Sequence, residues 1–296
     1  MPTVGVAHWL RLPPAVVSYA SWYASASKQP SAYRQLLRDV FGADQDVGQQ
    51  GFSTRQQIIE LAAAIGARPG VRILDICSGP SGPAACIAST LECTTVAMDR
   101  STMAFYGAHE DAPPNLHAVV GDASSLPFAS GSFDGALVLD SFTSLHEPAR
   151  VLGEVARVLR PGGSLAFSTE VGPALLPAER RKFRRSEVPS IMTAAEWLRL
   201  LHQAGFTAVR WNDRTRSAAV IARRLADRLA AAGPELKAEL GARAVDDLAA
   251  TLAAWAELLE CGRVSELAVV AERGHVRDVA DYLSETAGTT SRLQST

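Results

Sequence analysis

The sequence has few of the residues that would indicate a disulfide framework, a metal centre or a membrane span. It contains four cysteines in 296 residues, none of them in a Cys-x-x-Cys pair or at zinc-site intervals from a histidine. We therefore expect reduced thiols and no metal ion. No stretch approaches the roughly 18 consecutive apolar residues of a membrane span, and the first residues lack the basic flank and long apolar core of a signal peptide. These absences predict a cytoplasmic protein with no membrane partner.

Excess charge of either sign is also lacking. The formal net charge is -2 and 20% of the residues are charged, so the chain as a whole has no attraction for polyanions. No nucleic-acid partner is expected. Hydrophobic residues make up 47% of the chain, which is enough for a large buried core and indicates an ordinary globular protein. The composition does not distinguish a monomer from a homodimer.

Strand and helix patterns alternate along the chain with short connections, which is typical of parallel β-α-β units. Helical periodicity is expected over Glu147 to Val158 and Thr193 to Ala204, and the Pro161-Gly162 pair fits a type II turn. The Ala-, Leu- and Arg-rich residues 214–260 are also expected to be helical. The segments with strand character are residues 72–76, 94–99, 116–120, 133–139, 164–169, 206–212 and 264–271. The sequence thus predicts an α/β fold, with a Rossmann-like, mainly parallel seven-stranded sheet and a helical insertion before the last strand.

Three regions are expected along the chain. They are an N-terminal helical cap or lid over residues 1–66, the main domain over 67–275, and a polar tail over 276–296 that is predicted to be disordered. In the cap, Ser53 and Gln56 have the spacing of a capping box before a helix. Aromatic residues there either cover a pocket as a lid or anchor the core of the cap: Trp9, Tyr19, Trp22, Tyr23 and Tyr33.

The most informative segment is ILDICSGPSGPA, residues 73–84. An apolar strand ends near Asp75, passes through a loop of small residues and enters a helix, which is how open α/β sheets build a nucleoside pocket. A dinucleotide-binding loop begins in the same way. Pro80 and Pro83, however, remove two backbone N–H donors from the place where a pyrophosphate would need them. The loop therefore favours a nucleoside cofactor that carries no phosphate.

Acidic residues also follow the next predicted strands. Asp99 ends the second strand, where a carboxylate can accept hydrogen bonds from both ribose hydroxyls, or can simply cap the strand end. Asp122 follows the third strand, where it can accept from an adenine amino group or form an Asx turn. Asp140 and Ser141 follow the fourth strand and are expected to face the same crevice. Carboxylates at consecutive strand ends are a more specific sign of a nucleoside pocket than either one alone.

From residue 72 to 169 the chain resembles the class I S-adenosylmethionine-dependent methyltransferases, in the branch of ubiquinone-type, sarcosine and dimethylglycine, and antibiotic-tailoring enzymes. The matching segments are LDICSGPSGPA, AMDRS, GDASSLPFASGSFDGALVLDS and EVARVLRPGGSLAF. The usual loop is Asp-x-Gly-x-Gly-x-Gly, and here Cys77 and Ser81 replace two glycines. The resemblance implies S-adenosylmethionine as cofactor and a small-molecule substrate. It also implies a cofactor pocket formed by Asp75, Cys77, Gly79, Asp99, Arg100, Gly121, Asp122, Ala123, Asp140 and Ser141.

Two residues are candidates for catalysis. Methyl transfer from a sulfonium needs a general base only when the nucleophile begins protonated. His146, just after the fourth strand, is the candidate base, although a loop histidine that caps the next helix has the same pattern. Glu170, at the end of the fifth strand, either orients His146 or binds a substrate cation, or is an exposed residue without function. The basic run 180–185 is either a solvated face or a contact for an anionic substrate or carrier.

The sequence therefore predicts a methyltransferase that acts on an oxygen, nitrogen or carbon nucleophile of a small organic molecule, such as a specialised metabolite. One alternative is a cyclase or decarboxylase that binds the same cofactor without methyl transfer. A nicotinamide oxidoreductase is a third possibility, against which Pro80 and Pro83 argue. Nucleic-acid methylation is disfavoured, because residues 139–142 are Leu-Asp-Ser-Phe and not the Asn/Asp-Pro-Pro-aromatic run that grips an exocyclic amine.

Overall fold

The chain folds around a seven-stranded sheet, and the computed structural model describes residues 31–105, 112–183 and 188–274. The order of the strands is β3-β2-β1-β4-β5-β7-β6; β7 is antiparallel to both of its neighbours and the other pairs are parallel. The predicted Rossmann-like, mainly parallel sheet is confirmed. The strands are β1 (Arg72–Ile76), β2 (Thr94–Asp99), β3 (Leu116–Val120), β4 (Phe133–Val138), β5 (Leu159–Val171), β6 (Phe206–Asp213) and β7 (Ser265–Arg273).

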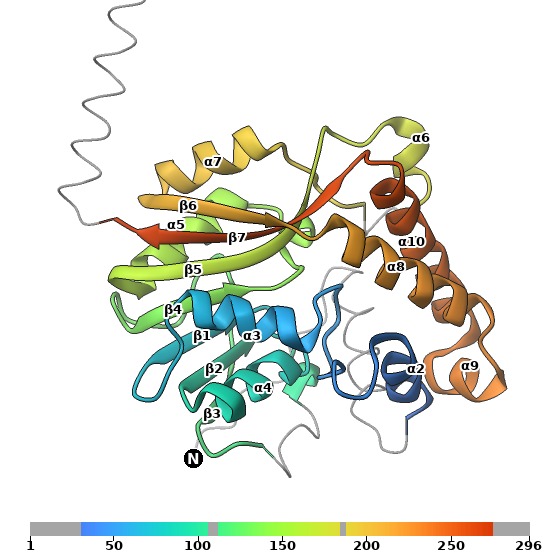
Figure 1. Cartoon of the computed structure of the whole chain (residues 1–296), viewed down its shortest axis with the longest axis horizontal. Coiled ribbons are helices and arrows are strands. Elements are labelled where there is room, and N and C mark those ends of the chain that lie inside the picture. The colour runs from blue at the N-terminus through green and yellow to red at the C-terminus, as the bar shows by residue number, and fades with distance from the viewer. Residues whose placement is uncertain (1–30, 106–111, 184–187, 275–296) are drawn as a thin grey trace, which may run out of the picture.

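Helices cover both faces of the sheet and gather beside one end of it (Figure 1). The helices are α2 (Ala32–Phe41), α3 (Arg55–Ala64), α4 (Gly82–Leu91), α5 (Pro148–Val158), α6 (Pro177–Arg180), α7 (Ala194–Gln203), α8 (Thr215–Ala230), α9 (Pro234–Leu240) and α10 (Ala242–Glu260), with 3-10 turns η1 (Thr102–Phe105) and η2 (Phe142–Ser144). α3 and α4 pack on one face, and α5 and α7 on the other. α8, α9 and α10 lie between β6 and β7 in the chain, which confirms the predicted helical insertion.

Apolar side chains divide the interior into three cores. On one face, α5 buries Val151 and Val155 at helical spacing against the sheet, and Phe142, Phe167 and Trp197 extend this core with ring centroids 4.9 to 5.0 Å apart. α3 and α4 form the second core on the opposite face. The third core lies among α2, α8, α9 and α10. The insertion therefore packs mainly on α2 and on itself, which leaves the carboxyl-end edge of the sheet available for a site.

Strand β5 is longer than the sequence pattern predicted. The apolar run suggested 164–169, but the strand begins at Leu159, which pairs with Phe133 of β4, and the register then shifts so that Ser164 pairs with Gly135. The turn between these two pairs contains Gly162 at φ +77°, as a type II turn requires. The polar and glycine residues of this turn interrupt the apolar pattern, which is why the pattern missed the first part of the strand.

The predicted capping box was wrong by one residue. The hydroxyl of Thr54, not Ser53, accepts from the backbone N–H of Gln57, and the Gln57 side chain accepts in return from the Thr54 backbone N–H. Both residue pairs have the required spacing, so the sequence pattern alone could not separate them. Ser53 is buried in the wall of the cavity described below, while the Gln56 side chain bonds to Glu60 on the surface.

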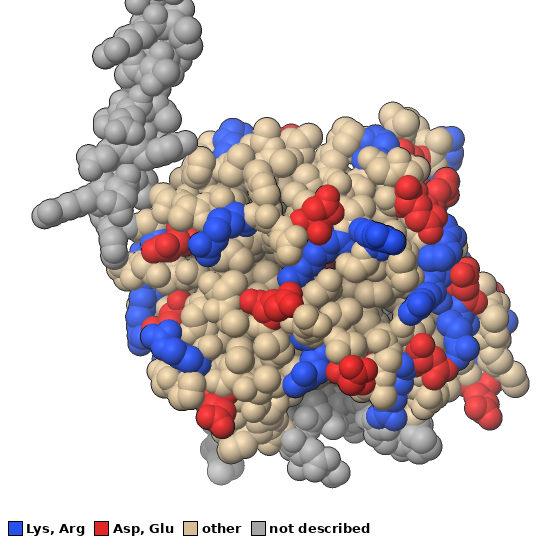
Figure 2. Space-filling view, in the orientation of Figure 1, with Lys and Arg blue, Asp and Glu red and all other residues tan. Residues whose placement is uncertain are grey.

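Charged side chains of both signs are interspersed over the face shown in Figure 2. Ion pairs lie both within the helical insertion and between the insertion and its surroundings. Arg223 of α8 pairs with Glu260 of α10 at 2.7 Å, and Arg228 of α8 pairs with Asp39 of α2. In the basic run, Lys182 pairs with Glu257 of α10. At least one cation of that run is therefore used within the protein.

Some expectations fall outside the described residues: those for Trp9, Tyr19, Trp22 and Tyr23, for Arg184 and Arg185, and for the tail 276–296. Tyr33 is described, and it packs in the core of the insertion with 5% of its surface exposed. The division into a cap over 1–66, a main domain and a tail stays a prediction. Over the described ranges, no helix is both long and apolar enough to cross a membrane.

Candidate active site

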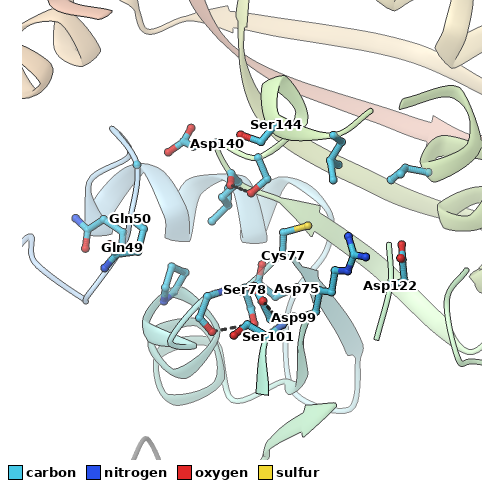
Figure 3. A pocket seen from close by; sticks show the side chains of 18 of the residues that line it. Gln49, Gln50, Asp75, Cys77, Ser78, Asp99, Ser101, Asp122, Asp140 and Ser144 are labelled. Atoms are coloured by element: carbon cyan, nitrogen blue, oxygen red, sulfur yellow. Dashed lines mark hydrogen bonds between the residues drawn. The ribbon is translucent and has the colours of Figure 1, made fainter. Parts of the chain in front are cut away.

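A cavity of about 420 Å³ lies at the carboxyl ends of the parallel strands. Because parallel strands end at the same edge of a sheet, chain segments that are far apart in the sequence converge there. Figure 3 shows Gln49 and Gln50 at one end of the cavity and Asp122 at the other, with Asp75, Cys77 and Asp99 between them. The cavity is therefore elongated and lined by acidic and small polar side chains.

Most of the residues singled out from the sequence line this cavity. Three predicted residues do not: Gly121, Ala123 and Glu170. Ala123 is buried in the core beneath α5, and a side chain at Gly121 would collide with the Met98 sulfur at 2.8 Å. Packing thus accounts for both residues, and their contact with a ligand stays a prediction. The predicted residues that do line the cavity are Asp75, Cys77, Gly79, Asp99, Arg100, Asp122, Asp140, Ser141 and His146.

Asp75 is the most deeply buried acid of the cavity wall, with 1% of its surface exposed. Within the described residues its Oδ2 atom has no hydrogen-bond partner. Burial, and then the charge of Asp99, raise the pKa of Asp75 to about 8. A buried carboxyl group with a free oxygen is costly unless a ligand supplies a donor or a positive charge.

We expect Asp75→Asn to stabilise the ligand-free protein at pH 8. The folded-state pKa of about 8 lies above the ordinary 3.8. At a pH between these two values, Asp75 is therefore protonated in the folded protein and ionised in the unfolded chain. The contribution of Asp75 to the free energy of unfolding therefore falls as the pH rises from about 4 to about 8. Asparagine does not titrate. The free energy of unfolding of the variant should therefore exceed that of the wild type by an amount that grows to about 1 to 3 kcal/mol as the pH rises across this range.

Urea unfolding of both proteins at pH 4 and pH 8 measures this difference. Asp227→Asn, on the exposed side of α8, is the matched control and should show no such change. An Asp75→Asn variant that is no more stable than the wild type at pH 8 would contradict the raised pKa.

The loop after β1 has an unusual backbone conformation, and few of its backbone amides are free to bind a ligand. Cys77, Gly79 and Ser81 have φ values of +60°, +53° and +66°, so two non-glycine residues adopt the left-handed conformation that glycine favours. The amide of Ser78 donates to Met98 O, that of Gly79 to Asp99 Oδ2, and that of Ser81 to Ser78 O. With Pro80 and Pro83 lacking a donor, few amides of this loop remain for a phosphate.

Asp99 holds this loop in place. Its Oδ2 accepts from the Gly79 amide at 3.0 Å and its Oδ1 from the Ser101 amide at 2.9 Å. The side chain is 8% exposed, and burial raises its pKa, although these backbone hydrogen bonds act in the opposite direction. The strand-capping role that the sequence left open is therefore present, and the same carboxylate also lines the cavity. A carboxylate oxygen has two lone pairs, so both roles are compatible.

Asp122 forms the Asx turn that the sequence left open. Its Oδ1 accepts from the backbone N–H of Ser124 at 2.8 Å and from the Ser124 hydroxyl at 2.7 Å. Burial acts to raise the pKa of Asp122, but the Ser124 hydrogen bonds and the charges of Arg100 and Arg150 outweigh it and leave the pKa lowered. Asp122 is exposed at the end of the cavity, where it stays ionised at neutral pH.

A segment that the sequence analysis missed closes the other end of the cavity. This segment, residues 47–53, is called the strap here. A side chain at Gly82 would stand 1.9 Å from Val47 O, and one at Gly51 would stand 1.9 Å from Asp140 Oδ2, so both glycines are required by close backbone approach. The Phe52 amide donates to Asp140 Oδ2 at 2.9 Å. The strap thus packs against Gly82, which follows the loop after β1 and is counted with it here as the glycine-rich loop. It is also hydrogen-bonded to Asp140, just after β4.

The strap places three polar residues in the cavity wall, Gln49, Gln50 and Ser53. Gln49 is 3% exposed, and its side chain accepts from the Val47 amide and donates to Gln45 O. The sequence signal for this segment was the pair of glutamines between two glycines, Gly48 and Gly51. That signal indicates a turn and does not by itself indicate a site.

Three alternatives were open for Glu170: a residue that orients His146, a residue that binds a substrate cation, and an exposed residue without function. The structure contradicts the third, and the other two stay predictions. Glu170 lies within β5, is 4% exposed, and stands opposite Glu266 of β7 in the antiparallel register. Burial, and then the charge of Asp140, raise the pKa of Glu170 to about 8. The sequence could not reveal this, because Glu266 becomes its neighbour only through pairing of β5 with β7. His146 is exposed at the cavity rim, after η2.

Comparison with known proteins supports the same type of site. The family model described as a methyltransferase domain matches residues 74–167. An O-methyltransferase of Aspergillus nomiae is 31% identical over 198 residues, which cover 61% of this chain and 88% of that protein. A demethylmenaquinone methyltransferase of Renibacterium salmoninarum is 30% identical over 157 residues, which cover 52% of this chain. The chain spans 65% of the length of that protein.

Solved structures show the same fold at lower sequence identity. A cyclopropane synthase of Mycobacterium tuberculosis superposes with a TM-score of 0.70 at 15% identity, covering 88% of this chain and 99% of that one. A likeness at this identity shows the shared fold and leaves the reaction to be argued from the site.

Proposed function

The chain belongs to the class I S-adenosylmethionine-dependent methyltransferases, and from that membership we propose that it transfers a methyl group to an oxygen, nitrogen or carbon atom of a small organic molecule, such as a specialised metabolite. The observation that carries this proposal is a row of carboxylates along one cavity, at the carboxyl ends of β1, β2 and β3: Asp75, Asp99 and Asp122. Such a row suits a ligand with a cationic end, a ribose and a base.

The residues of the cavity fit S-adenosylmethionine. Asp75 has a buried oxygen that finds no partner among the described residues, which suits the ammonium group of the methionine part. The loop offers few free amides, which suits a cofactor without phosphate groups. The volume of about 420 Å³ lies in the range of small-molecule sites.

We assign the residues as follows. Asp99 accepts from the ribose hydroxyls, and Asp122 accepts from the adenine amino group at the opposite end from the strap. Arg100 and Cys77 border the nucleoside. Asp75, Asp140 and Ser141 surround the methionine part, together with Gln49 and Gln50 of the strap. These roles rest on which side chains line the cavity and on their order along it.

The protein contributes mainly orientation and exclusion of water. When bound, S-adenosylmethionine supplies a methyl group on a positively charged sulfur that is already electrophilic. The strap and the loop after β1 hold their side chains around that group, and such orientation is worth as much as roughly 7 to 11 kcal/mol in well-arranged systems. His146 at the rim takes the proton of an acceptor that begins protonated.

Formation of S-adenosylhomocysteine tests the proposal. Incubation with S-adenosylmethionine and candidate acceptors should yield S-adenosylhomocysteine and a methylated product in equal amounts, measured by mass spectrometry. A changed acceptor without S-adenosylhomocysteine would indicate a cyclase or decarboxylase instead. Failure to bind S-adenosylhomocysteine in isothermal titration would overturn both possibilities.

In the same assay we expect His146→Gln to lower the turnover rate about 10²- to 10³-fold for an acceptor that must lose a proton. The dissociation constant for S-adenosylhomocysteine should stay unchanged, because the exposed imidazole has no role in holding the strap or the loop. His202→Gln on α7, which lies outside the cavity lining, is the control. Full activity of His146→Gln at all pH values would exclude the histidine as base.

A further inference from the structure

A second group of ionisable side chains lies directly behind the cavity wall. We call Asp140, Glu170, Glu266 and Arg214 the acid cluster. They come from the ends of β4 and β5, the start of β7 and the residue before α8. Glu170, Glu266 and Arg214 are 4%, 2% and 8% exposed, and Glu170 stands opposite Glu266 in the β5–β7 register. Tertiary structure alone brings these four residues together.

The charges of the acid cluster do not balance. The cluster contains three carboxyl groups and one guanidinium. The charges of Asp140 and Glu266 act on Arg214, which also lies 3.9 Å from Glu60 and 3.4 Å from the carbonyl of Gln57. Burial, followed by the charges of Glu170 and Asp140, raises the pKa of Glu266 well above its ordinary value, and Arg214 acts against this rise. Without a ligand, the cluster therefore holds protons on buried carboxyl groups.

The hydrogen bonds do not balance either. The cluster contributes four of the buried atoms that have no hydrogen-bond partner within the described residues: Glu170 Oε2, both carboxyl oxygens of Glu266, and Arg214 Nη1. A proton on Glu266 can be shared with the side chain of Asp140, but this still leaves Glu170 Oε2 without a donor. Buried polar groups in proteins are nearly always paired, so atoms left without partners call for a specific explanation.

The acid cluster is continuous with the cavity. Asp140 belongs to both, because it lines the cavity and also contributes to the raised pKa values of Glu170 and Glu266. Thr143 of η2 is hydrogen-bonded to Glu170, and the next residue, Ser144, lines the cavity. Asp140 and Ser144 both line the cavity (Figure 3). A molecule held beside the methyl donor is therefore close to the cluster.

We propose that the acid cluster binds a protonated amino group of the methyl acceptor, so that the acceptors of this protein are small organic amines. This proposal rests on the methyltransferase function argued above and names its substrate class. An ammonium group offers three N–H donors and a positive charge, which suit buried carboxyl groups that otherwise hold protons. A hydroxyl group offers one donor and no charge. Among the described residues no group of acidic side chains has the arrangement of a metal site.

Binding of matched amines and alcohols tests the proposal. Benzylamine, phenethylamine and cyclohexylmethylamine, each with the corresponding alcohol, are titrated by NMR into protein saturated with S-adenosylhomocysteine at pH 7. We expect at least one amine to bind about tenfold or more tightly than its alcohol. Glu266→Gln and Glu170→Gln should each abolish that preference without changing the affinity for S-adenosylhomocysteine. Glu272→Gln, exposed on the same strand as Glu266, should leave the preference intact.

The possible failures are distinguishable. Equal binding of all amines and alcohols, or an unchanged preference in Glu266→Gln, would overturn the amine proposal while leaving the methyltransferase function in place. Loss of S-adenosylhomocysteine binding in both variants would show that the cluster only supports the fold, and would also overturn it. If the wild type fails to bind S-adenosylhomocysteine, the proposed function fails and the amine proposal fails with it.

Discussion

Replacing Asp99 by asparagine is expected to weaken S-adenosylhomocysteine binding by about 100-fold, which corresponds to ~2.7 kcal/mol. The carboxylate accepts from two backbone amides, those of Gly79 and Ser101, and is 8% exposed. The asparagine side chain has one oxygen, so one of the two amides would face its NH₂ group instead of an acceptor. An unsatisfied buried amide costs about 1 to 3 kcal/mol, and the loop that carries Cys77 and Gly79 would shift. A ribose would in addition lose one of its acceptors.

The matched control is Asp122→Asn, which makes the same chemical change at an exposed position. The Oδ1 atom of Asp122 receives both Ser124 hydrogen bonds, and an amide oxygen can accept them equally well. Here we expect a loss of about tenfold or less, because a solvated carboxylate contributes little beyond one hydrogen bond. Isothermal titration of both variants makes the comparison. An equal loss in the two variants would contradict the central position assigned to Asp99.

Replacing Gly82 by alanine is expected to have the second large effect, a loss of about 2 to 4 kcal/mol in the free energy of unfolding. The added Cβ would stand 1.9 Å from Val47 O and 3.2 Å from the Gly48 carbonyl carbon. Both neighbours are backbone atoms, so a side-chain rotation cannot relieve the overlap. The strap must move away from the glycine-rich loop, and Gln49 and Gln50 move with it. S-adenosylhomocysteine affinity should therefore fall by at least about tenfold.

Gly153→Ala in α5 is the control for this prediction. A Cβ at Gly153 meets nothing within 4 Å, and glycine inside a helix costs roughly 0.5 to 1 kcal/mol relative to alanine. This variant should therefore be more stable than the wild type by that amount and bind S-adenosylhomocysteine normally. Thermal unfolding and isothermal titration measure both properties. A Gly82→Ala variant with the melting temperature and affinity of the wild type would show that the strap does not rest on the loop.

The sequence predicted the frame of the site well because that frame is local. A strand, a loop of small residues and a helix are adjacent in the chain, and the acidic residues Asp75, Asp99 and Asp122 each lie at or just after the carboxyl end of their own strand. Parallel strands end at one edge, so three local patterns were enough to locate one crevice. Ala123 does not line the cavity, because a residue next to a site residue need not point in the same direction. Local reasoning failed by one position at Ser53, where two overlapping patterns were equally good.

What the sequence determined by itself is the class of fold and the cofactor type, because periodicity and turn chemistry act over a few residues; the position of the nucleoside along the sheet stays a prediction. Only the tertiary structure decided that the strap closes one end of the cavity and that Glu170 stands opposite Glu266. Those contacts join residues about 35 to 100 positions apart, and no local pattern encodes which partner a strand edge or a glycine will meet. Under the amine proposal, the residues that select the acceptor are long-range contacts of this kind, so the acceptor could be addressed only after the fold was known.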